Sequence, residues 1–545
     1  MPEQCNHENG CSCHVAGAPM PPMPQGFAPP PPYQAAGSQM PMPPMPRMQM
    51  PSWAAAAVNR PSMRRGWRIG IATVVVAELI AAAVFITVQL TDDDGDSTTA
   101  RTVGSVAGAA DSGAGAASVV AGAAAGGADS AGLVASPGAG NLRKGAVFLQ
   151  SNDQTVNSVV AFARNANGKL VEVGRYRTGG KGTGSFEDSS NGIVLGSAEG
   201  ESSPNHNIND NNLLFVTNAG SGTITVFGVQ PEGLERIGET PSGGNRPVSL
   251  TVNNGLLYVL NSGEVDRRLI LGPTTALDNC THDNLPSITG FRVTPDGTLQ
   301  AIPGSTRLLS GVQRSGCAQL SFTPDGRHLV VTERLSGRAG DPTTEQGAID
   351  IFDVQYDGTL GNRQINYPAG KGPFGFTFTK DGKLVTTEQN GALGNPGGGL
   401  ASTYTINTDG TIKAISKAVP NRQTDTCWIA LSHSKNIAYV SSPWSDGRIS
   451  SYTVSPTGSL TLQHEVASAA DGKDALKDNI ATGATDLALS SDDHFLYQLN
   501  SFEGVLVVFK AQPNGLLTFV ERHQVFALEP FGAGGEAAPF GLAVY

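Results

Sequence analysis

Apolar and polar positions alternate from about residue 143 to the end of the chain, in a pattern that recurs seven times. Each copy has a small residue, alternating apolar positions, an aromatic residue and then a turn with glycine, as in ITVFGVQPEGL (224–234) and IDIFDVQYDGTL (349–360). The aromatic residues are spaced 48 to 65 residues apart and are Phe162, Phe227, Phe291, Phe352, Tyr404, Tyr452 and Phe509. Alternation with period two is typical of β-strands, and the Asp-Gly, Glu-Gly and Asn-Gly pairs mark hairpin turns.

A second pattern precedes each copy after the first and predicts an inner strand, a turn and a second strand, as in RPVSLTVNNGLLYVLN (246–261). Together the two patterns give about four strands per repeat. Seven such repeats predict an all-β fold, a seven-bladed β-propeller. The stretch AVFLQSN (146–152) lacks a preceding inner strand, and PFGLAVY (539–545) is an inner strand with nothing after it. We therefore expect the two ends of the domain to complete one blade and close the ring.

The remainder of the chain divides into three segments. Residues 1–66 hold all nine methionines and many prolines, and such a segment cannot bury enough apolar surface to fold, so we expect a disordered tail. Within residues 67–90 lies the only long apolar run, which at about 1.5 Å per residue is long enough to cross a bilayer as a helix. Residues 91–142 are rich in Gly, Ala and Ser and predict a flexible tether. The propeller is then residues 143–545.

The distribution of charge predicts how the chain is oriented in a membrane and which kinds of partner it can bind. Four arginines precede the apolar run and four aspartates follow it, so the positive-inside rule predicts a single-pass type II protein with a cytoplasmic N-terminus and an extracellular or lumenal propeller. The formal net charge of −11 argues against a nucleic-acid partner. The proline-rich tail suits a cytoplasmic partner with an aromatic groove.

The first residues of the tail, CNHENGCSCH, are rich in Cys and His. These soft ligands suit zinc or copper(I), but their spacing matches no structural zinc module. We interpret them as reactive or lipid-modified cysteines, and predict no metal and no cofactor.

Aligning the predicted second strands gives one polar column, expected at the central mouth: Asn152, Asn218, Asn261, Glu333, Glu388, Ser442 and Asn500. For the asparagines, turn capping is the simpler interpretation, although Asn218 and Asn261 are also candidates to bind a ligand. Glu333 and Glu388 replace Asn in adjacent repeats. If the two carboxylates are neighbours, their repulsion would raise the pKa of one of them, and that carboxylate could act as a general base. Alternatively, each pairs with a nearby arginine such as Arg334, which is itself a substrate-binding candidate.

Two further residues are candidates for the same mouth. Arg246 begins an inner strand, and its planar guanidinium suits a substrate carboxylate or phosphate, or equally an interblade salt bridge. Trp428 lies in the fifth inner strand, in TCWIAL, where it either packs in the core or stacks on a ligand. With Glu333, Glu388 and Arg246 as catalytic candidates, convergence of the three in a narrow pocket would favour chemistry, and mutual neutralisation would favour binding.

The chain resembles the lactonase-type seven-bladed propeller family, which includes 6-phosphogluconolactonase and carboxymuconate-cyclase-like proteins. The stretches that carry the resemblance include LLFVTNAGSGTITVF (213–227), PSGGNRPVSLTVNNGLLYVLNSG (241–263) and TCWIALSHSKNIAYVSS (426–442). The resemblance covers nearly all of residues 145–545 and implies a lactone hydrolase or related cyclase. It also implies a Pro-His pair near an inner-strand start, and no such start here has histidine. The second hypothesis is therefore a non-catalytic propeller that binds a carbohydrate, a small ligand or a protein.

Three cysteines follow the apolar run: Cys280, Cys317 and Cys427. An oxidising compartment permits a disulfide. Cys280 lies in an insertion and Cys317 begins the next inner strand, so they are the first candidate pair, which leaves Cys427 free.

Overall fold

The computed structural model describes residues 140–184, 186–198, 212–263, 286–310, 315–334, 346–391, 395–445, 447–468, 484–526 and 539–545. The predicted tail and membrane helix, and nearly all of the tether, lie outside these residues. Among the helices of the described part, none is long and apolar enough to cross a membrane.

The described residues form one short 3-10 helix, η1 (Leu142–Lys144), and 29 strands. The inner strands are β29 (Phe540–Val544), β4 (Ile193–Gly196), β8 (Pro247–Asn253), β13 (Cys317–Phe322), β17 (Pro373–Phe378), β21 (Ile429–Ser432) and β25 (Ala484–Leu489). The second strands are β1 (Ala146–Gln150), β5 (Leu213–Asn218), β9 (Leu256–Asn261), β14 (His328–Glu333), β18 (Leu384–Glu388), β22 (Ile437–Ser442) and β26 (Phe495–Asn500). The third strands are β2 (Ser158–Arg164), β6 (Thr223–Gln230), β10 (Ser287–Val293), β15 (Ala348–Val354), β19 (Leu400–Ile406), β23 (Arg448–Val454) and β27 (Val505–Ala511). The outer strands are β3 (Leu170–Arg177), β7 (Gly233–Pro241), β11 (Leu299–Ala301) with β12 (Arg307–Leu308), β16 (Leu360–Asn366), β20 (Ile412–Pro420), β24 (Leu460–Ser468) and β28 (Leu517–Gln524).

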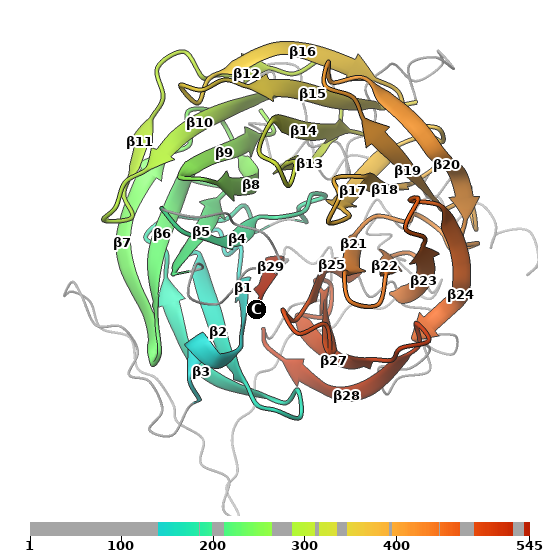
Figure 1. Ribbon diagram of the computed structural model, residues 1–545. Helices are drawn as coiled ribbons and strands as arrows, with labels where there is room; N and C mark the ends of the chain where they lie inside the picture. Colours follow the sequence, from blue (N-terminus) through green and yellow to red (C-terminus); the bar gives the residue numbers. More distant parts are fainter. Residues whose placement is uncertain are drawn as a thin grey trace, which may run out of the picture. The chain divides into compact units, whose positions relative to one another are not determined.

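These strands build seven antiparallel sheets, which we name blades A to G in chain order. Blade A is β29-β1-β2-β3, blade B is β4 to β7, blade C is β8 to β12, and blades D to G each take the next four strands. Figure 1 looks along the axis of the ring, with the inner strands around its centre and the outer strands at its rim. The predicted seven-bladed propeller is confirmed.

The ring closes through the two ends of the domain, as predicted. Strand β29 pairs with β1, with Ala543 opposite Phe148 and Leu542 opposite Leu149. Each inner strand also contacts the inner strands of both neighbouring blades, in a complete circle. Closure of this kind leaves no long unpaired strand edge around the ring.

The seven aromatic residues of the repeat all lie in third strands and are at most 2% exposed. Each packs against the preceding blade. Phe227 of blade B, for example, lies against Ala161 and Val173 of blade A, and Phe162 of blade A lies against Tyr497 of blade G. The repeat therefore encodes the interfaces between blades, where most of the core is buried.

Polar side chains on the inner strands join one blade to the next. Gln319 of β13 accepts a hydrogen bond from the backbone nitrogen of Phe376 and donates one to its carbonyl oxygen, both at 2.9 Å. Asp486 of β25 accepts one from the backbone nitrogen of Leu542 on β29. Buried backbone groups need such partners, so these side chains satisfy the inner edges of the blades.

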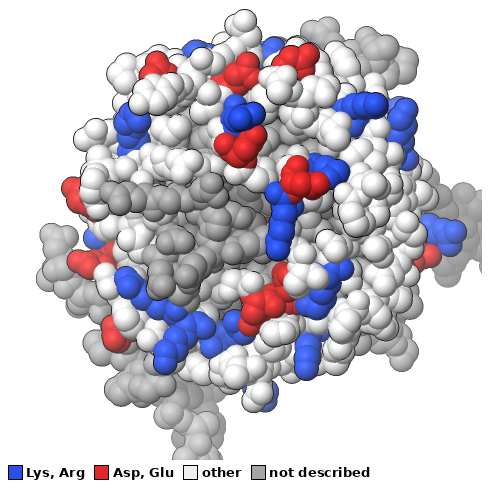
Figure 2. Space-filling view, in the orientation of Figure 1, with Lys and Arg blue, Asp and Glu red and all other residues white. Residues whose placement is uncertain are grey.

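The face seen in Figure 1 carries charges of both signs. Figure 2 shows basic and acidic side chains lying beside one another on it. The expectation that the chain binds no nucleic acid stays a prediction.

Candidate functional site

A connection between β3 and β4 crosses the central mouth of the propeller. We call its residues 186–189 the acidic segment. The indole nitrogen of Trp428, before β21 of blade F, donates to the carbonyl oxygen of Ser189 at 3.0 Å. The ring of Phe186 lies 5.2 Å from that of Phe502 in blade G. The connection that enters blade B therefore reaches blades F and G, neither of which is next to blade B in the ring.

Two arginines from adjacent blades bind the carboxylates of the acidic segment. Arg246, just before β8 of blade C, places Nη2 and Nε at 2.9 and 3.0 Å from Oε2 of Glu187. Arg334, just after β14 of blade D, places Nη2 2.9 Å from Oδ2 of Asp188. All four side chains are buried. Burying a charge is costly unless it is paired, so each of these arginines needs its carboxylate.

A third carboxyl completes the cluster. Asp425, two residues before Cys427 and fully buried, has its pKa raised to about 7, by burial first and then by the charge of Asp188. Arg334 and hydrogen bonds from Cys427 and Trp444 act in the opposite direction. The site thus holds two guanidinium groups, two carboxylates and a third carboxyl group that titrates near neutral pH.

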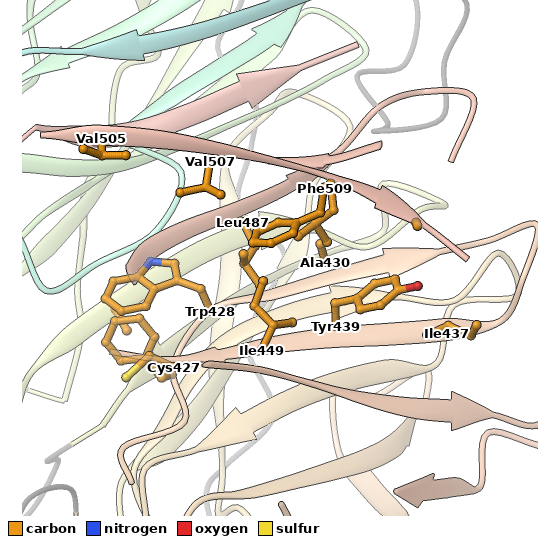
Figure 3. Close-up of a cluster of buried hydrophobic side chains, with 14 of the residues drawn as sticks. Cys427, Trp428, Ala430, Ile437, Tyr439, Ile449, Leu487, Val505, Val507 and Phe509 are labelled. Carbon is orange, nitrogen blue, oxygen red and sulfur yellow. The ribbon is translucent and has the colours of Figure 1, made fainter. Parts of the chain in front are cut away.

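The thiol of Cys427 lies 3.4 Å from Oδ1 of Asp425 and also accepts a hydrogen bond from Gln389 at 3.4 Å. Burial raises the pKa of this thiol well above its usual value. Figure 3 shows Cys427 and Trp428 together at one end of a cluster of buried apolar side chains that extends to Ile437. Cys427 and Trp428 therefore connect the charged cluster at the mouth with the apolar core of blades F and G.

The backbone is strained at two residues of the cluster. Arg246 has a φ of 53° and Asp425 a φ of 61°, in the left-handed region that glycine and asparagine adopt more easily. Each such residue costs on the order of 1–3 kcal/mol and persists only where the surrounding structure imposes it. Strain of this kind is common at ligand clamps and active sites. Other non-glycine residues of the described part with positive φ, such as Ala418 on β20 and Asn436 in a hairpin turn, lie outside this cluster.

Glu333, one of the two glutamates expected at the mouth, is fully buried and receives hydrogen bonds from the hydroxyls of Ser310 and Ser315 at 2.9 and 2.7 Å. Its carboxyl partner is Asp350 on β15. Burial, and then Glu333, raise the pKa of Asp350 well above its usual value. Glu333 therefore has Asp350 of its own blade as its carboxyl neighbour, in place of the Glu388 that the sequence suggested.

Glu388 has different neighbours. Its Oε1 accepts hydrogen bonds from the hydroxyl of Tyr404 at 3.1 Å and from the backbone nitrogen of Gly370 at 3.0 Å. Burial raises its pKa. Glu388 therefore ties a loop to its own blade, and the two glutamates have separate partners.

The two asparagines named from the sequence also tie loops. Asn218 accepts a hydrogen bond from Asn157 and donates one to Thr225, both at 2.9 Å. Asn261 donates to the carbonyl oxygen of Ser242 at 3.3 Å. Asn218 bonds side chains and Asn261 bonds a backbone oxygen 19 residues away, so these bonds join separate segments and do not cap a local turn. Whether either also meets a ligand stays a prediction.

After the two glutamates of the aligned polar column, the next residue contacts the cluster at the mouth. Arg334 follows Glu333 and contacts the acidic segment, and Gln389 follows Glu388 and contacts Cys427. Successive side chains of a strand point to opposite faces. The glutamates therefore bond loops of their own blades, while the residues that follow them point toward the mouth.

Of the residues predicted from the sequence, the structure gathers Arg246, Arg334 and Trp428 around the acidic segment. Sequence reasoning missed three carboxyl groups of the cluster: Glu187, Asp188 and Asp425. All three lie in connections outside the repeated pattern, and only the pairing of two acidic residues at 187 and 188 marks them in the sequence.

Cys317 is disulfide-bonded, and Cys280, its predicted partner, lies outside the described residues. Cys427 is the free thiol of the described part, as predicted. No group of three or more His, Cys, Asp or Glu side chains in that part is arranged to hold a metal ion.

No protein-family model and no curated protein sequence matches this chain. Solved structures do match. A protein from Lactobacillus plantarum is 14% identical, covers 74% of this chain and 99% of its own, and has a TM-score of 0.50. A putative 6-phosphogluconolactonase from Bacteroides fragilis is 15% identical (74% and 98% covered, TM-score 0.47). The periplasmic gluconolactonase PpgL of Pseudomonas aeruginosa is 16% identical (73% and 98% covered, TM-score 0.48).

The chain is a seven-bladed propeller with 6-phosphogluconolactonase-like proteins among its structural neighbours. The resemblance noted in the sequence is thereby confirmed for the fold. At these identities the likeness extends to the fold alone, so the chemistry has to be argued from the residues at the mouth.

Proposed function

We propose that this protein is a lactonase-like propeller that binds a small anionic ligand at its central mouth. The observation that carries the proposal is the convergence of Arg246 and Arg334, two buried guanidinium groups from adjacent blades, on one four-residue segment. Planar guanidinium groups match carboxylate and phosphate geometry. The ligand class is therefore a sugar acid or lactone that carries a carboxylate or phosphate group.

Energetics support a binding role for the arginines. Ion pairs in a protein interior are often no more stabilising than apolar side chains of similar volume. The cluster at the mouth, with strained backbone at Arg246 and Asp425, adds a further cost. Strained residues are common at active sites and ligand clamps, which supports a role in recognition beyond a structural one.

Lactone hydrolysis is the second candidate function, and Asp425 favours it. A carboxyl group whose pKa is about 7 is well matched to general base catalysis at neutral pH. In the reaction, the Asp425 carboxylate would take a proton from water as the water oxygen bonds to the lactone carbonyl carbon. The ring C–O bond then breaks, and the ring oxygen receives that proton to give the hydroxy acid. A guanidinium of the cluster would stabilise the oxyanion.

We further propose, from the expected membrane span at residues 67–90, that this activity lies on the non-cytoplasmic side. The support is the run of apolar residues with arginines before it and aspartates after it, which the positive-inside rule interprets as a signal anchor. The ligand would then come from an extracellular or lumenal pool.

Binding is tested on the full-length protein in detergent micelles by titration calorimetry. The probes are 6-phosphogluconate, gluconate and glucose, and we expect affinity to fall in that order. The double variant D188N/R334Q removes one ion pair without leaving an unpaired charge, and should weaken 6-phosphogluconate binding at least tenfold. R327Q removes an exposed arginine and serves as the control. Unchanged binding by D188N/R334Q would contradict the proposal.

Hydrolysis is tested on the same preparation with a lactone panel that includes 6-phosphogluconolactone. Turnover should rise with pH through about 7 because Asp425 acts as a base only when ionised, and D425N should lose it. E333Q and E388Q test the glutamates named from the sequence. Loss of turnover in these two, with D425N active, would move the base to blade D or E.

A further inference from the structure

The acidic segment occupies the place that an anionic ligand would take. Glu187 and Asp188 are adjacent in sequence, and their carboxylates meet two different arginines. Adjacent Cα atoms are only about 3.8 Å apart. The two arginines are therefore set to receive two anionic groups that a short covalent spacer holds together.

Backbone hydrogen bonds anchor the connection on both sides of these two residues. Gly184 donates to the carbonyl oxygen of Asn152 at 2.8 Å, and Ser190 donates to that of Ala318 at 2.9 Å. Glu187 and Asp188 are bound through their carboxylates instead, to the arginines and, for Glu187, also to the hydroxyl of Thr183. Two side chains can therefore leave the arginines while the connection keeps its anchors.

We propose that Glu187 and Asp188 are a built-in substitute for a dianionic ligand, and that a small dicarboxylate or phosphorylated acid binds by displacing them. This inference rests on the proposed function and specifies both its ligand class and its control. A dianion replaces the two negative charges one for one, so the buried arginines remain neutralised. A monoanion replaces only one of the two carboxylates and leaves one buried guanidinium without the carboxylate it is paired with, which is costly.

The acidic segment then limits affinity, since a ligand must compete with carboxylates that belong to the same chain and are always present at high effective concentration. Only a ligand that engages both arginines competes well with it. Competition from the acidic segment thus makes the site prefer dianions to monoanions.

The test compares full-length wild type with E187Q/D188N, in which both carboxylates become amides of the same shape. The probes are glutarate and its monocarboxylate counterpart pentanoate, titrated by calorimetry. We expect glutarate to bind the variant at least tenfold more tightly than wild type, with a much smaller gain for pentanoate. The control E172Q/E235Q removes two exposed carboxylates from β3 and β7 and should bind as wild type does.

E187Q/D188N leaves two buried arginines without carboxylates, and its folding has to be checked by thermal melting. Glutarate should raise its melting temperature more than it raises that of wild type. E187D/D188E keeps both charges but moves each carboxylate by one methylene group, and should show an intermediate gain in affinity. The shift in melting temperature and the E187D/D188E variant keep the proposal testable if E187Q/D188N is unstable.

The outcomes separate the two proposals. Equal glutarate affinity in wild type, E187Q/D188N and E187D/D188E would overturn the role of the acidic segment and leave the anion site standing. No binding of glutarate or 6-phosphogluconate by any of the proteins would overturn the anion site, and the substitute ligand with it.

Discussion

Arg334 and Asp188 join two parts of the propeller that are far apart in sequence, with Nη2 of the arginine 2.9 Å from Oδ2 of the aspartate. The arginine follows the second strand of blade D, and the aspartate belongs to the connection that enters blade B. Both side chains are almost completely buried. The pair joins this connection to blade D, as Arg246 and Glu187 join it to blade C.

This geometry predicts a strong difference between single and double substitutions. R334Q leaves Asp188 as a buried charge without its arginine, which should cost about 3–5 kcal/mol in the free energy of unfolding. D188N/R334Q removes both charges and should recover most of that loss. Chemical denaturation of the full-length proteins measures both. A double variant as unstable as R334Q would show that the pairing does not set the cost.

The bonds between inner strands give a second prediction. In Q319L, the backbone nitrogen and oxygen of Phe376 lose the side-chain amide that bonds both at 2.9 Å. An unsatisfied buried group costs about 1–3 kcal/mol, so Q319L should lose on the order of 3 kcal/mol. The matched control is S321A, whose half-buried hydroxyl bonds only the adjacent carbonyl oxygen of Phe322 at 3.3 Å. Similar melting temperatures for the two variants would argue against interblade bonding by Gln319.

The repeat explains why the fold could be predicted from the sequence alone. Seven aromatic positions at intervals of 48 to 65 residues correspond to seven third strands, because each aromatic side chain must fill an interface between blades. Blade A could be predicted from two fragments for the same reason, since β1 and β29 each carry half of the pattern. The repeat is visible because the packing that it encodes is repeated.

The mouth is not repeated, and the sequence was correspondingly less informative there. The alignment of the second strands predicted Glu333 at the mouth, but the residue that contacts the cluster there is the next one, Arg334. An alignment identifies equivalent positions but does not show toward which face each side chain points. Glu187 and Asp188 lie in a connection that no other blade copies, so no comparison within the chain could mark them. Asp425 likewise depends for its pKa on Asp188 and Arg334, which are distant in sequence.

A third prediction concerns Glu388 and Tyr404. The tyrosine hydroxyl donates to Oε1 of Glu388 at 3.1 Å and accepts from the backbone nitrogen of Ala369 at 2.7 Å. Y404F should therefore cost about 1–3 kcal/mol, because it leaves a buried carboxyl group and a backbone nitrogen with fewer partners. Y356F, at a fully exposed tyrosine, is the control. In a double-mutant cycle, E388Q and Y404F should be coupled, and strict additivity would show that the contact contributes nothing.

The fourth prediction is a pH dependence of stability that arises from Asp425. Folding raises the pKa of this carboxyl group to about 7 from a usual value of 3.8, by burial first and then by Asp188. The folded protein therefore binds a proton between about pH 4 and pH 7 that the unfolded chain releases, so the contribution of Asp425 to the free energy of unfolding falls as pH rises through this range. Below pH 4 both states are protonated and the contribution is constant.

D425N removes this titration. Relative to wild type, the variant should gain stability as pH rises from about 4 to about 7, by up to an amount on the order of 4 kcal/mol, and the difference should level off above pH 7. Asp350 and Asp486, whose pKa values are also raised by burial, are present in both proteins, so the difference between the two stability curves isolates Asp425. D409N, at an exposed turn where hydrogen bonds from Thr411 lower the pKa, should give no such rise between pH 5 and pH 8. A D425N curve parallel to that of wild type across this range would show that Asp425 is already ionised in the folded protein, and would remove it as a candidate base.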